Sequence, residues 1–219
     1  NDETWQSNKH AEVDSWIALN SSVQLFIDGL DLGVGGLNFS TRFKRLVDYV
    51  RITKGKKAIL NTYTAYQDFA MFGDGVMKES CIQRWNGVSA SNPDSYTRES
   101  WSLELNRSSW FSSHGIPVYC QAFGNKSTNP QIIQNYSDLI NIYYASKVLG
   151  YQYFYLTQPD FGYAWNIFLP DTGADMSNDW TTDDSIVYYR RYAKGIVYYN
   201  SSSGQGWLDN GRTVNSAQL

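Results

Sequence analysis

Carboxylate side chains follow two apolar runs of this sequence, and their type suits the hydrolysis of a glycosidic bond. Asp28 and Asp31 close one such run, and Glu79 closes a later one. Glycoside hydrolysis needs a protonated carboxyl group for the leaving group and a second carboxylate, about 5 to 5.5 Å away as a nucleophile or about 6.5 to 9.5 Å away as a base for water. If the chain is an enzyme, we predict Glu79 as the general acid and Asp31 as the nucleophile or base.

A wider set of polar and aromatic residues could bind a sugar around that pair. Amides and acids at strand ends orient sugar hydroxyls, and aromatic rings offer stacking platforms. The alternative is that the polar members satisfy backbone groups in long loops, and that Glu79 forms a salt bridge with Lys78 or Arg84. The predicted substrate-binding residues are Asp28, Asn61, Tyr63, Trp85, Gln121, Gln158, Asp160, Tyr163 and Trp165.

Several other chemistries lack their sequence signals. Gly33, Gly35 and Gly36 have the wrong spacing for a Gly-x-Gly-x-x-Gly phosphate loop, and a nucleophile-elbow serine is absent. His10, His114 and two cysteines are too few for a zinc site, so we predict no cofactor and no metal. The net charge of -3 includes no basic stripe for nucleic acid, and no run approaches the ~20 apolar residues of a membrane span.

Apolar runs and helical patterns alternate along most of the chain. The first run is apolar on both faces, which is typical of a parallel strand covered on each side. Ser40 or Thr41 is the expected cap of the helix that follows, and Gly55 is its expected stop. The predicted strands are residues 23–33, 58–63, 75–82, 116–124 and 151–157, and the predicted helices are residues 10–20, 39–55, 66–72, 96–113 and 130–150.

This alternation predicts an α/β fold with a parallel sheet, and the (β/α)8 barrel is the commonest closed form of such a sheet. Only five strands precede residues 158–180, and we expect residues 183–200 to add a helix-strand pair or to begin a β-rich piece. We predict a TIM-barrel-like sheet that is incomplete or completed by another segment or chain, with an open doubly wound sheet as the alternative. Residues 1–200 would form the barrel portion and residues 201–219 a C-terminal tail or linker.

Six Asn-x-Ser/Thr sequons and two cysteines indicate an extracellular or cell-surface protein. Each sequon is an N-glycan acceptor in a glycosylating secretory route. Cys81 and Cys120 could form one disulfide there or remain two separately buried thiols. The chain starts at Asn1 without an initiator methionine or a signal-like segment, so we expect a processed or truncated chain. The predicted glycosylation sites are Asn20, Asn38, Asn106, Asn125, Asn135 and Asn200.

The segment IDGLDLGVG, residues 27–35, resembles the fourth-strand motif of family-18 chitinases, Asp-Gly-Leu/Ile-Asp-Leu/Ile-Asp-x-Glu. The order of DGLDLG, AILNTYT, GVMKES, IPVYCQAFG and YRRYAKGIVYYN also resembles glycoside-hydrolase-like barrel proteins of the spherulin-4 type. The resemblance covers most of the chain and implies the later strands of a glycosidase barrel. It keeps Asp28 and Asp31, but the third aspartate of the chitinase motif falls on Gly33 and its proton-donating glutamate on Gly35. The spherulin-type pattern also expects an acid at Gly33.

Glycine carries no carboxyl group, so the resemblance implies an impaired catalyst. It favours a secreted, N-glycosylated protein that uses the barrel as a carbohydrate-binding or structural scaffold and self-assembles into a homo-oligomer, surface layer or extracellular filament. An aromatic content of 17 Tyr and 8 Trp fits either sugar stacking or a subunit interface. If Gly33 and Gly35 only form a turn, the alternative is an active glycoside hydrolase that acts on an extracellular polysaccharide. A third alternative is an adhesion domain that recognises protein.

Overall fold

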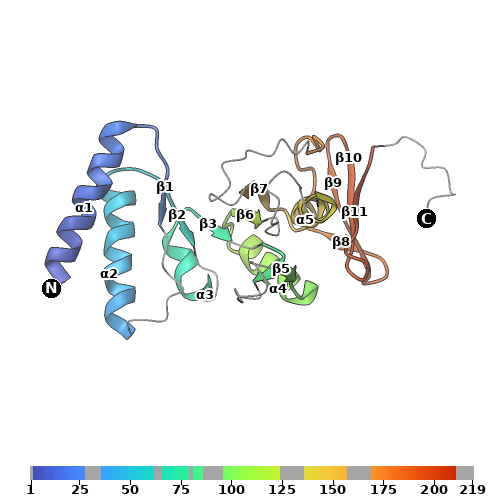
Figure 1. The fold of residues 1–219 in the computed structure, drawn as a ribbon, viewed down its shortest axis with the longest axis horizontal. Coiled ribbons are helices and arrows are strands. Elements are labelled where there is room, and N and C mark those ends of the chain that lie inside the picture. Colours follow the sequence, from blue (N-terminus) through green and yellow to red (C-terminus); the bar gives the residue numbers. More distant parts are fainter. Residues whose placement is uncertain are drawn as a thin grey trace, which may run out of the picture. The chain divides into compact units, whose positions relative to one another are not determined.

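The computed structural model describes residues 2–27, 36–61, 66–78, 81–85, 96–123, 136–156 and 169–210. By its internal contacts the chain divides into two compact units, residues 1–78 and 79–219. Figure 1 shows the elements of each unit. Within the described ranges, no helix is long and apolar enough to cross a membrane.

Over its described residues, the first unit alternates helices with three parallel strands. Strand β2 lies between β1 and β3, with Leu25 opposite Ala58 and Ile59 opposite Gly75. All four residues of β2 are buried, as expected for a central parallel strand. The elements are α1 (Asp2–Leu19), β1 (Leu25–Ile27), α2 (Gly36–Asp48), a π-helical turn (Tyr49–Thr53), β2 (Ala58–Asn61), α3 (Tyr66–Phe69), a 3-10 turn (Ala70–Phe72) and β3 (Gly75–Lys78).

Helix α1 begins at Asp2, well before the predicted start at residue 10. Its first half lacks apolar periodicity and is held by polar contacts with α2 and the π-helical turn. The Nε2 of Gln6 donates to the carbonyl oxygen of Arg42 at 2.8 Å, and the His10 ring stacks on Tyr49 with centroids 3.6 Å apart. The core of this unit is apolar and consists of Leu25, Phe43, Val47, Val50, Ala58 and Leu60.

The start of α2 also differs from the prediction. The helix begins at Gly36, so Ser40 and Thr41 lie inside it and neither is its N-cap. The predicted stop is confirmed, because Gly55 adopts a φ of 62° just after the π-helical turn ends. A left-handed residue at this position is the usual end of a helix, and glycine adopts it without strain.

In its described residues, the second unit combines two parallel strands, two helices and two antiparallel sheets. Strand β6 pairs in parallel with β7, and β4 pairs with β5 as a two-stranded antiparallel sheet. The remaining strands form an antiparallel sheet in the order β11-β10-β9-β8. The elements are β4 (Gln83–Trp85), β5 (Tyr96–Arg98), α4 (Trp101–Ser113), β6 (Val118–Phe123), α5 (Tyr136–Val148), β7 (Gln152–Leu156), β8 (Thr181–Thr182), β9 (Val187–Tyr192), β10 (Gly195–Asn200) and β11 (Gly206–Asp209).

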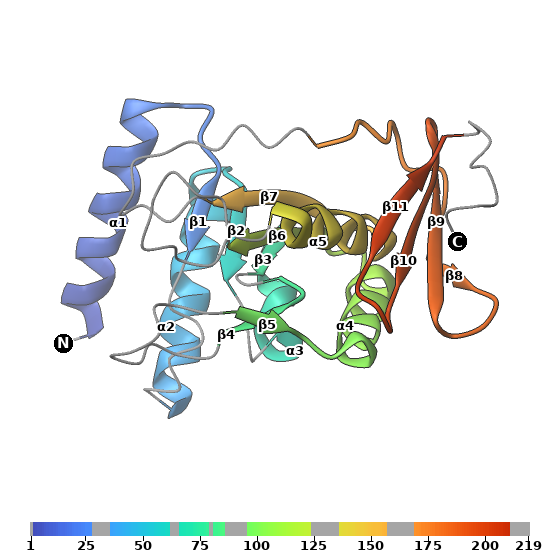
Figure 2. The same cartoon turned by 45° about the vertical axis from the view of Figure 1, so that its right-hand side comes forward.

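The four-stranded antiparallel sheet packs one face against helices of its own unit. Helix α5 contacts β9, β10 and β11, and Figures 1 and 2 show α4 and α5 on the same side of this sheet. The ring of Trp101 on α4 lies 4.5 Å from Tyr199 and 5.4 Å from Tyr188, centroid to centroid. Tyr188, Val197 and Tyr199 are buried on this inner face.

Three predicted segments differ from the structure of the second unit. Residues 96–98 form β5, so the predicted helix begins only at Trp101. Residues 187–200 form the hairpin β9–β10 instead of a helix-strand pair, because alternate residues of these strands face the core. This outcome matches the β-rich alternative. Part of the predicted tail, residues 201–219, is a strand, since β11 pairs with β10; residues 211–219 lie outside the described residues.

The five predicted strands of the parallel type correspond to β1, β2, β3, β6 and β7. The third is shorter than the predicted 75–82, because residues 81 and 82 form a turn in which Ile82 has a φ of 62°. The fold is therefore α/β, as predicted. Among the described residues, however, no closed barrel is formed: after β7 the described chain resumes in the antiparallel sheet.

Candidate functional site

Most of the predicted pocket lies outside the described residues. This holds for both members of the predicted catalytic pair, so the distance between the carboxyl groups of Asp31 and Glu79 stays a prediction. It also holds for the side chain of Trp85, whose backbone lies in β4. The other predicted site residues outside the described ranges are Asp28, Tyr63, Gln158, Asp160, Tyr163 and Trp165.

Two polar residues occupy the carboxyl ends of neighbouring strands in the first unit. Asn61 ends β2 with 3% of its surface exposed, and Lys78 ends β3 with 5% exposed. The strands pair Asn61 with Met77, and successive strand residues alternate between faces. Lys78, one residue beyond Met77, therefore points to the opposite face of the sheet from Asn61. Asn61 is buried at the end of the strand, where the sequence predicts a site residue, whereas the sequence predicts Lys78 only as an ion-pair partner of Glu79.

Gln121 is the predicted site residue of the second unit whose side chain the structure describes. It lies in the middle of β6 with 2% of its surface exposed. Within the described part of the chain, its Oε1 atom is buried and has no hydrogen-bond partner. An unsatisfied buried acceptor costs about 1–3 kcal/mol. This oxygen can therefore accept a further hydrogen bond, from a buried water or from a ligand hydroxyl group that reaches the interior beside β6.

The backbone beside Gln121 is held by a disulfide and a hydrogen bond. Cys81 and Cys120 form the disulfide, with Cα atoms 5.2 Å apart, so the structure has the bonded alternative of the two left open by the sequence. The N–H of Cys81 also donates to the carbonyl oxygen of Gln121 at 2.9 Å. The turn at Cys81, two residues after Glu79 in the sequence, is therefore fixed to β6 next to Gln121.

Ile82, in the same turn, has a left-handed backbone. Its φ is 62°, which is strained for a β-branched residue, and only 1% of its surface is exposed. Its carbonyl oxygen accepts a hydrogen bond from the N–H of Glu99 at 2.9 Å. Residues held in such conformations cost about 1–3 kcal/mol and concentrate at functional sites. The strained turn and the buried amide oxygen of Gln121 together make the part of β6 around Gln121 the best candidate site in the second unit.

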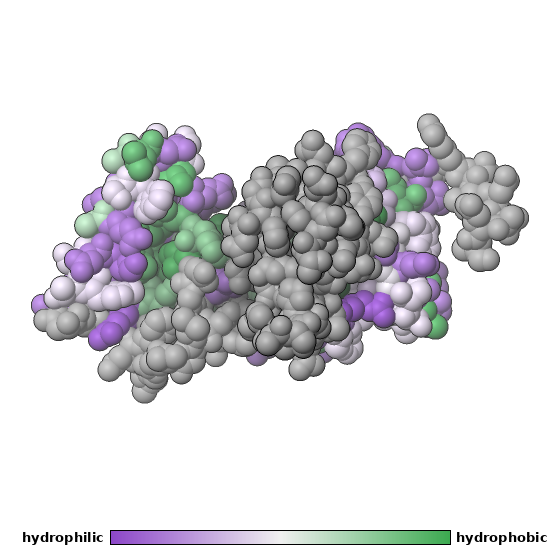
Figure 3. Space-filling model, viewed as in Figure 1, coloured by the Kyte–Doolittle hydropathy of each residue, from purple (hydrophilic) through white to green (hydrophobic). Residues whose placement is uncertain are grey.

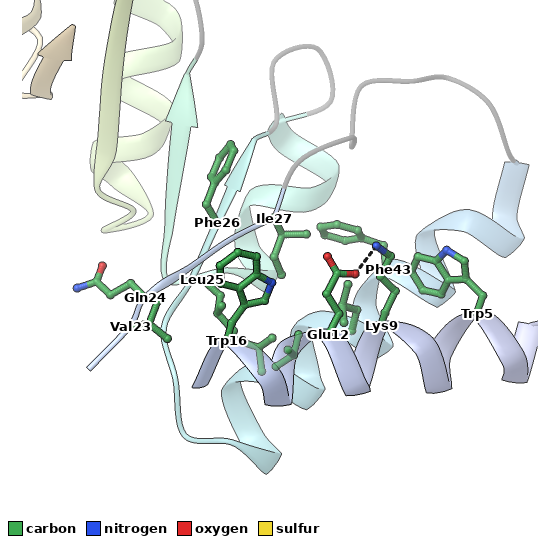
Figure 4. Close-up of a pocket in the computed structure, with 13 residues that line it drawn as sticks. Trp5, Lys9, Glu12, Trp16, Val23, Gln24, Leu25, Phe26, Ile27 and Phe43 are labelled. Carbon is green, nitrogen blue, oxygen red and sulfur yellow. Dashed lines mark hydrogen bonds and ion pairs between the residues drawn. The ribbon is translucent and has the colours of Figure 1, made fainter. Parts of the chain in front are cut away.

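The first unit contains an apolar cavity that the sequence did not predict. The cavity is about 630 Å³ in volume and lies between α1, β1 and α2. Figure 4 shows Trp5 and Trp16 on α1 with Phe43 on α2, and the ion pair between Lys9 and Glu12, whose atoms are 2.6 Å apart. Figure 3 shows apolar residues gathered beside α1. The only sequence signal was the set of apolar residues on a helix that is mostly polar.

The pKa shifts among the described residues arise from contacts that stabilise the structure more than they activate a side chain for catalysis. Burial raises the pKa of Tyr192, whose hydroxyl donates to the carbonyl oxygen of Lys147 at 2.7 Å. Burial also lowers the pKa of Lys147, whose Nζ lies over the Tyr143 and Tyr192 rings at 5.7 and 5.4 Å. Within the described ranges, no three His, Cys, Asp or Glu residues are grouped so as to hold a metal ion.

The predicted glycosylation sites differ in their surroundings. Asn20 and Asn106 are exposed, and Asn200 ends β10. The hydroxyl of Ser108, in the sequon of Asn106, is buried and donates to the carbonyl oxygen of Leu149 at 3.0 Å. A glycan at Asn106 would therefore have to be attached before α4 packs. The side chain of Asn38 and residues Asn125 and Asn135 lie outside the described residues.

Comparisons with known proteins support the fold but give no family. No protein-family model matches the chain, and no curated protein matches it. The glycoside hydrolase domain of PelA from Pseudomonas aeruginosa is similar in structure, with a TM-score of 0.50 and 15% sequence identity over 73% of this chain. A variant of that domain in which one glutamate is replaced by alanine gives the same values. The match spans 62% of the PelA domain, so this chain has a partial glycoside-hydrolase-like fold.

Proposed function

We propose that this chain is a carbohydrate-binding protein that uses a glycoside-hydrolase-like fold as a scaffold and is impaired in catalysis. One observation carries the proposal: the fold resembles a glycoside hydrolase domain over 73% of the chain, yet glycines occupy positions 33 and 35, where the resembling families place acids. Without those acids, Asp31 lacks the neighbouring proton donor that the chitinase motif supplies.

The candidate site at β6 supports binding of a hydroxyl-rich ligand. The buried Oε1 of Gln121 is a hydrogen-bond acceptor, and it lies on a strand fixed by the Cys81–Cys120 disulfide. Sites that hydrogen-bond a ligand hydroxyl discriminate strongly against ligands that lack it, because the buried group is then left unpaired. Neutral sugars present such hydroxyls at every ring position.

We further propose that the protein is secreted, N-glycosylated and part of a surface layer or extracellular filament. The six sequons and the disulfide support an oxidising secretory route. The exposed side chains of Asn20 and Asn106 are compatible with attached glycans. Self-assembly is the part of this proposal that rests on sequence alone, and electron microscopy of the purified protein tests it.

The second candidate function is an active glycoside hydrolase. The observation in its favour is that Glu79 lies two residues before Cys81, whose turn is bonded to the proposed ligand-binding strand β6. In this alternative, Glu79 protonates the leaving group and Asp31 acts as the nucleophile or base.

One experiment separates the two functions. Purified protein is tested for binding to immobilised polysaccharides and for release of reducing sugar, with Asp31→Asn, Glu79→Gln and the exposed control Glu3→Gln. The scaffold proposal expects binding without turnover. Turnover that is retained in Glu3→Gln but lost in either of the other two variants would establish the hydrolase. Absence of both binding and turnover across the panel would reject a carbohydrate function.

A further inference from the structure

A row of aromatic side chains crosses the antiparallel sheet of the second unit. Tyr198 on β10 lies opposite Tyr189 on β9 and opposite Trp207 on β11. The Tyr189 and Tyr198 ring centroids are 5.7 Å apart, and those of Tyr198 and Trp207 are 5.2 Å apart with the rings nearly parallel at 9°. The three rings thus form one continuous aromatic row, defined as Tyr189–Tyr198–Trp207, at right angles to the strands.

This row lies on the face of the sheet that turns away from α4 and α5. Residues that alternate with it, such as Tyr188, Val197 and Tyr199, are buried on the inner face. Tyr198 and Trp207 are only partly buried. Gly206 confirms the assignment of the faces, because a side chain there would meet Tyr144 on α5 while its neighbour Trp207 faces the other way.

Polar residues flank the aromatic row on the same face. Ile196 lies two residues before Tyr198 on β10 and therefore on the same face. It is opposite Arg191 on β9 and opposite Asp209 on β11. Both charged residues contribute to the electrostatic surroundings of the Tyr198 hydroxyl, whose pKa is raised chiefly by burial. Asp183 adds a second negative charge to these surroundings. With two negative side chains and one positive, the surface disfavours a polyanion and favours a neutral ligand rich in hydroxyl groups.

Amphipathic rings beside paired polar groups are the surface that a pyranose chain requires. The C–H face of a sugar ring packs on an aromatic ring, while the hydroxyls at its edge reach charged and phenolic groups. Trp207 is suited to this packing because β11 is the edge strand of the sheet as described, and within residues 2–210 no described strand covers the ring face that turns away from Tyr198.

We propose that Tyr189, Tyr198 and Trp207 form a binding platform for a neutral polysaccharide chain, with Arg191 and Asp209 as hydrogen-bonding residues at its border. The proposal deepens the carbohydrate function proposed above and depends on it. The platform is a second site, separate in sequence and in chemistry from the β6 site at Gln121. It holds the polysaccharide by stacking and needs no carboxylate pair.

The platform is tested with protein made in a host that does not glycosylate, so that a glycan on the nearby Asn200 cannot cover it. Mobility is measured in native gels that contain hydroxyethylcellulose, glycol chitin, mixed-linkage β-glucan or galactomannan, and affinity is calculated from the retardation. The variants are Trp207→Ala, Tyr198→Ala and Arg191→Ala, and Trp207→Phe retains a ring. Trp110→Ala, on α4, where the ring stacks on His114, is the matched control for loss of an aromatic residue.

We expect Trp207→Ala to weaken binding of at least one polysaccharide by about tenfold or more, as loss of one stacked ring implies. Tyr198→Ala should also weaken it, because the Tyr198 ring stacks on Trp207 and holds it in place. Trp207→Phe should recover most of the affinity, Arg191→Ala should weaken it by a smaller factor, and Trp110→Ala should leave it unchanged. Thermal unfolding of each variant shows whether the sheet is intact. Arg191 is exposed, so its variant still tests the platform if ring removal destabilises the sheet.

Each of the following outcomes would contradict the proposal that the aromatic row is a binding platform. If the wild-type protein binds a polysaccharide and the folded ring variants bind it equally well, the platform is rejected while the carbohydrate function stands. If the wild-type protein binds none of the four, both proposals fail. If Trp207→Ala instead abolishes a concentration-dependent self-association seen by gel filtration, the row is an interface between copies of this chain.

Discussion

Loss of the Cys81–Cys120 disulfide should strongly destabilise the second unit. We propose the double substitution Cys81→Ala and Cys120→Ala, because both residues are fully buried and alanine leaves no unpaired hydroxyl group. The bond joins residues 39 positions apart, and within the described residues there is no free cysteine to exchange with it. Removing it increases the conformational entropy of the unfolded chain.

The magnitude follows from the length of the closed loop. In the chain-entropy relation, a loop of this length lowers the entropy of the unfolded chain by about 13 cal/mol/K, or about 4 kcal/mol at 25 °C. That loss approaches the whole stability of a typical domain, which is about 5–15 kcal/mol. The turn at Ile82 should be affected first, because its strained backbone is held by the same bond.

The assay is urea unfolding followed by tryptophan fluorescence, with the wild-type protein before and after reduction in denaturant. We expect the double variant and the reduced protein to agree and to unfold at lower urea concentration, with a loss of about 3–5 kcal/mol. A loss below about 1 kcal/mol in the double variant would refute the reasoning, since the loop entropy would then not contribute to stability. Ile17→Val in the first unit is a control for a small unrelated change in packing.

Three further predictions concern single residues. The pKa of Asp74 is lowered: burial raises it, but the hydrogen bonds from the N–H of Ala58 at 3.0 Å and from Arg51 at 2.9 Å outweigh this effect. Its stabilisation is therefore present above about pH 4 and lost as the pH falls through the lower folded pKa, so acid titration of Asp74→Asn should show a shallower loss of stability than wild type. Gly195→Ala should cost about 2–4 kcal/mol in thermal unfolding, because φ is 149° and the new Cβ would meet the backbone of β11; an unchanged midpoint would contradict this. Ser108→Ala should cost about 1–2 kcal/mol through its lost hydrogen bond and should abolish any glycan at Asn106 in mass spectra from a glycosylating host, whereas a glycan that persists would reject that sequon.

The sequence by itself determined the parallel part of the fold. Strands such as β2, in which three successive apolar residues are all buried, are recognisable because a parallel strand is covered on both faces. The end of the second helix could also be predicted from the local sequence, because Gly55 tolerates a left-handed backbone that other residues avoid. These features depend on neighbouring residues in the chain, and local pattern therefore predicted them.

Only the tertiary structure decided which tyrosines are core and which are surface. The segment VYYRRYAKGIVYYN has no periodicity that separates a helix from a hairpin, and the contact of its inner face with Trp101 and α5 makes it a hairpin. The same contact leaves Tyr198 on the outer face and creates the aromatic row. The disulfide, the buried amide of Gln121 and the cavity beside Trp16 likewise join residues far apart in the sequence. Whether a residue is buried depends on which distant segments pack against it, and the local sequence pattern does not specify those contacts.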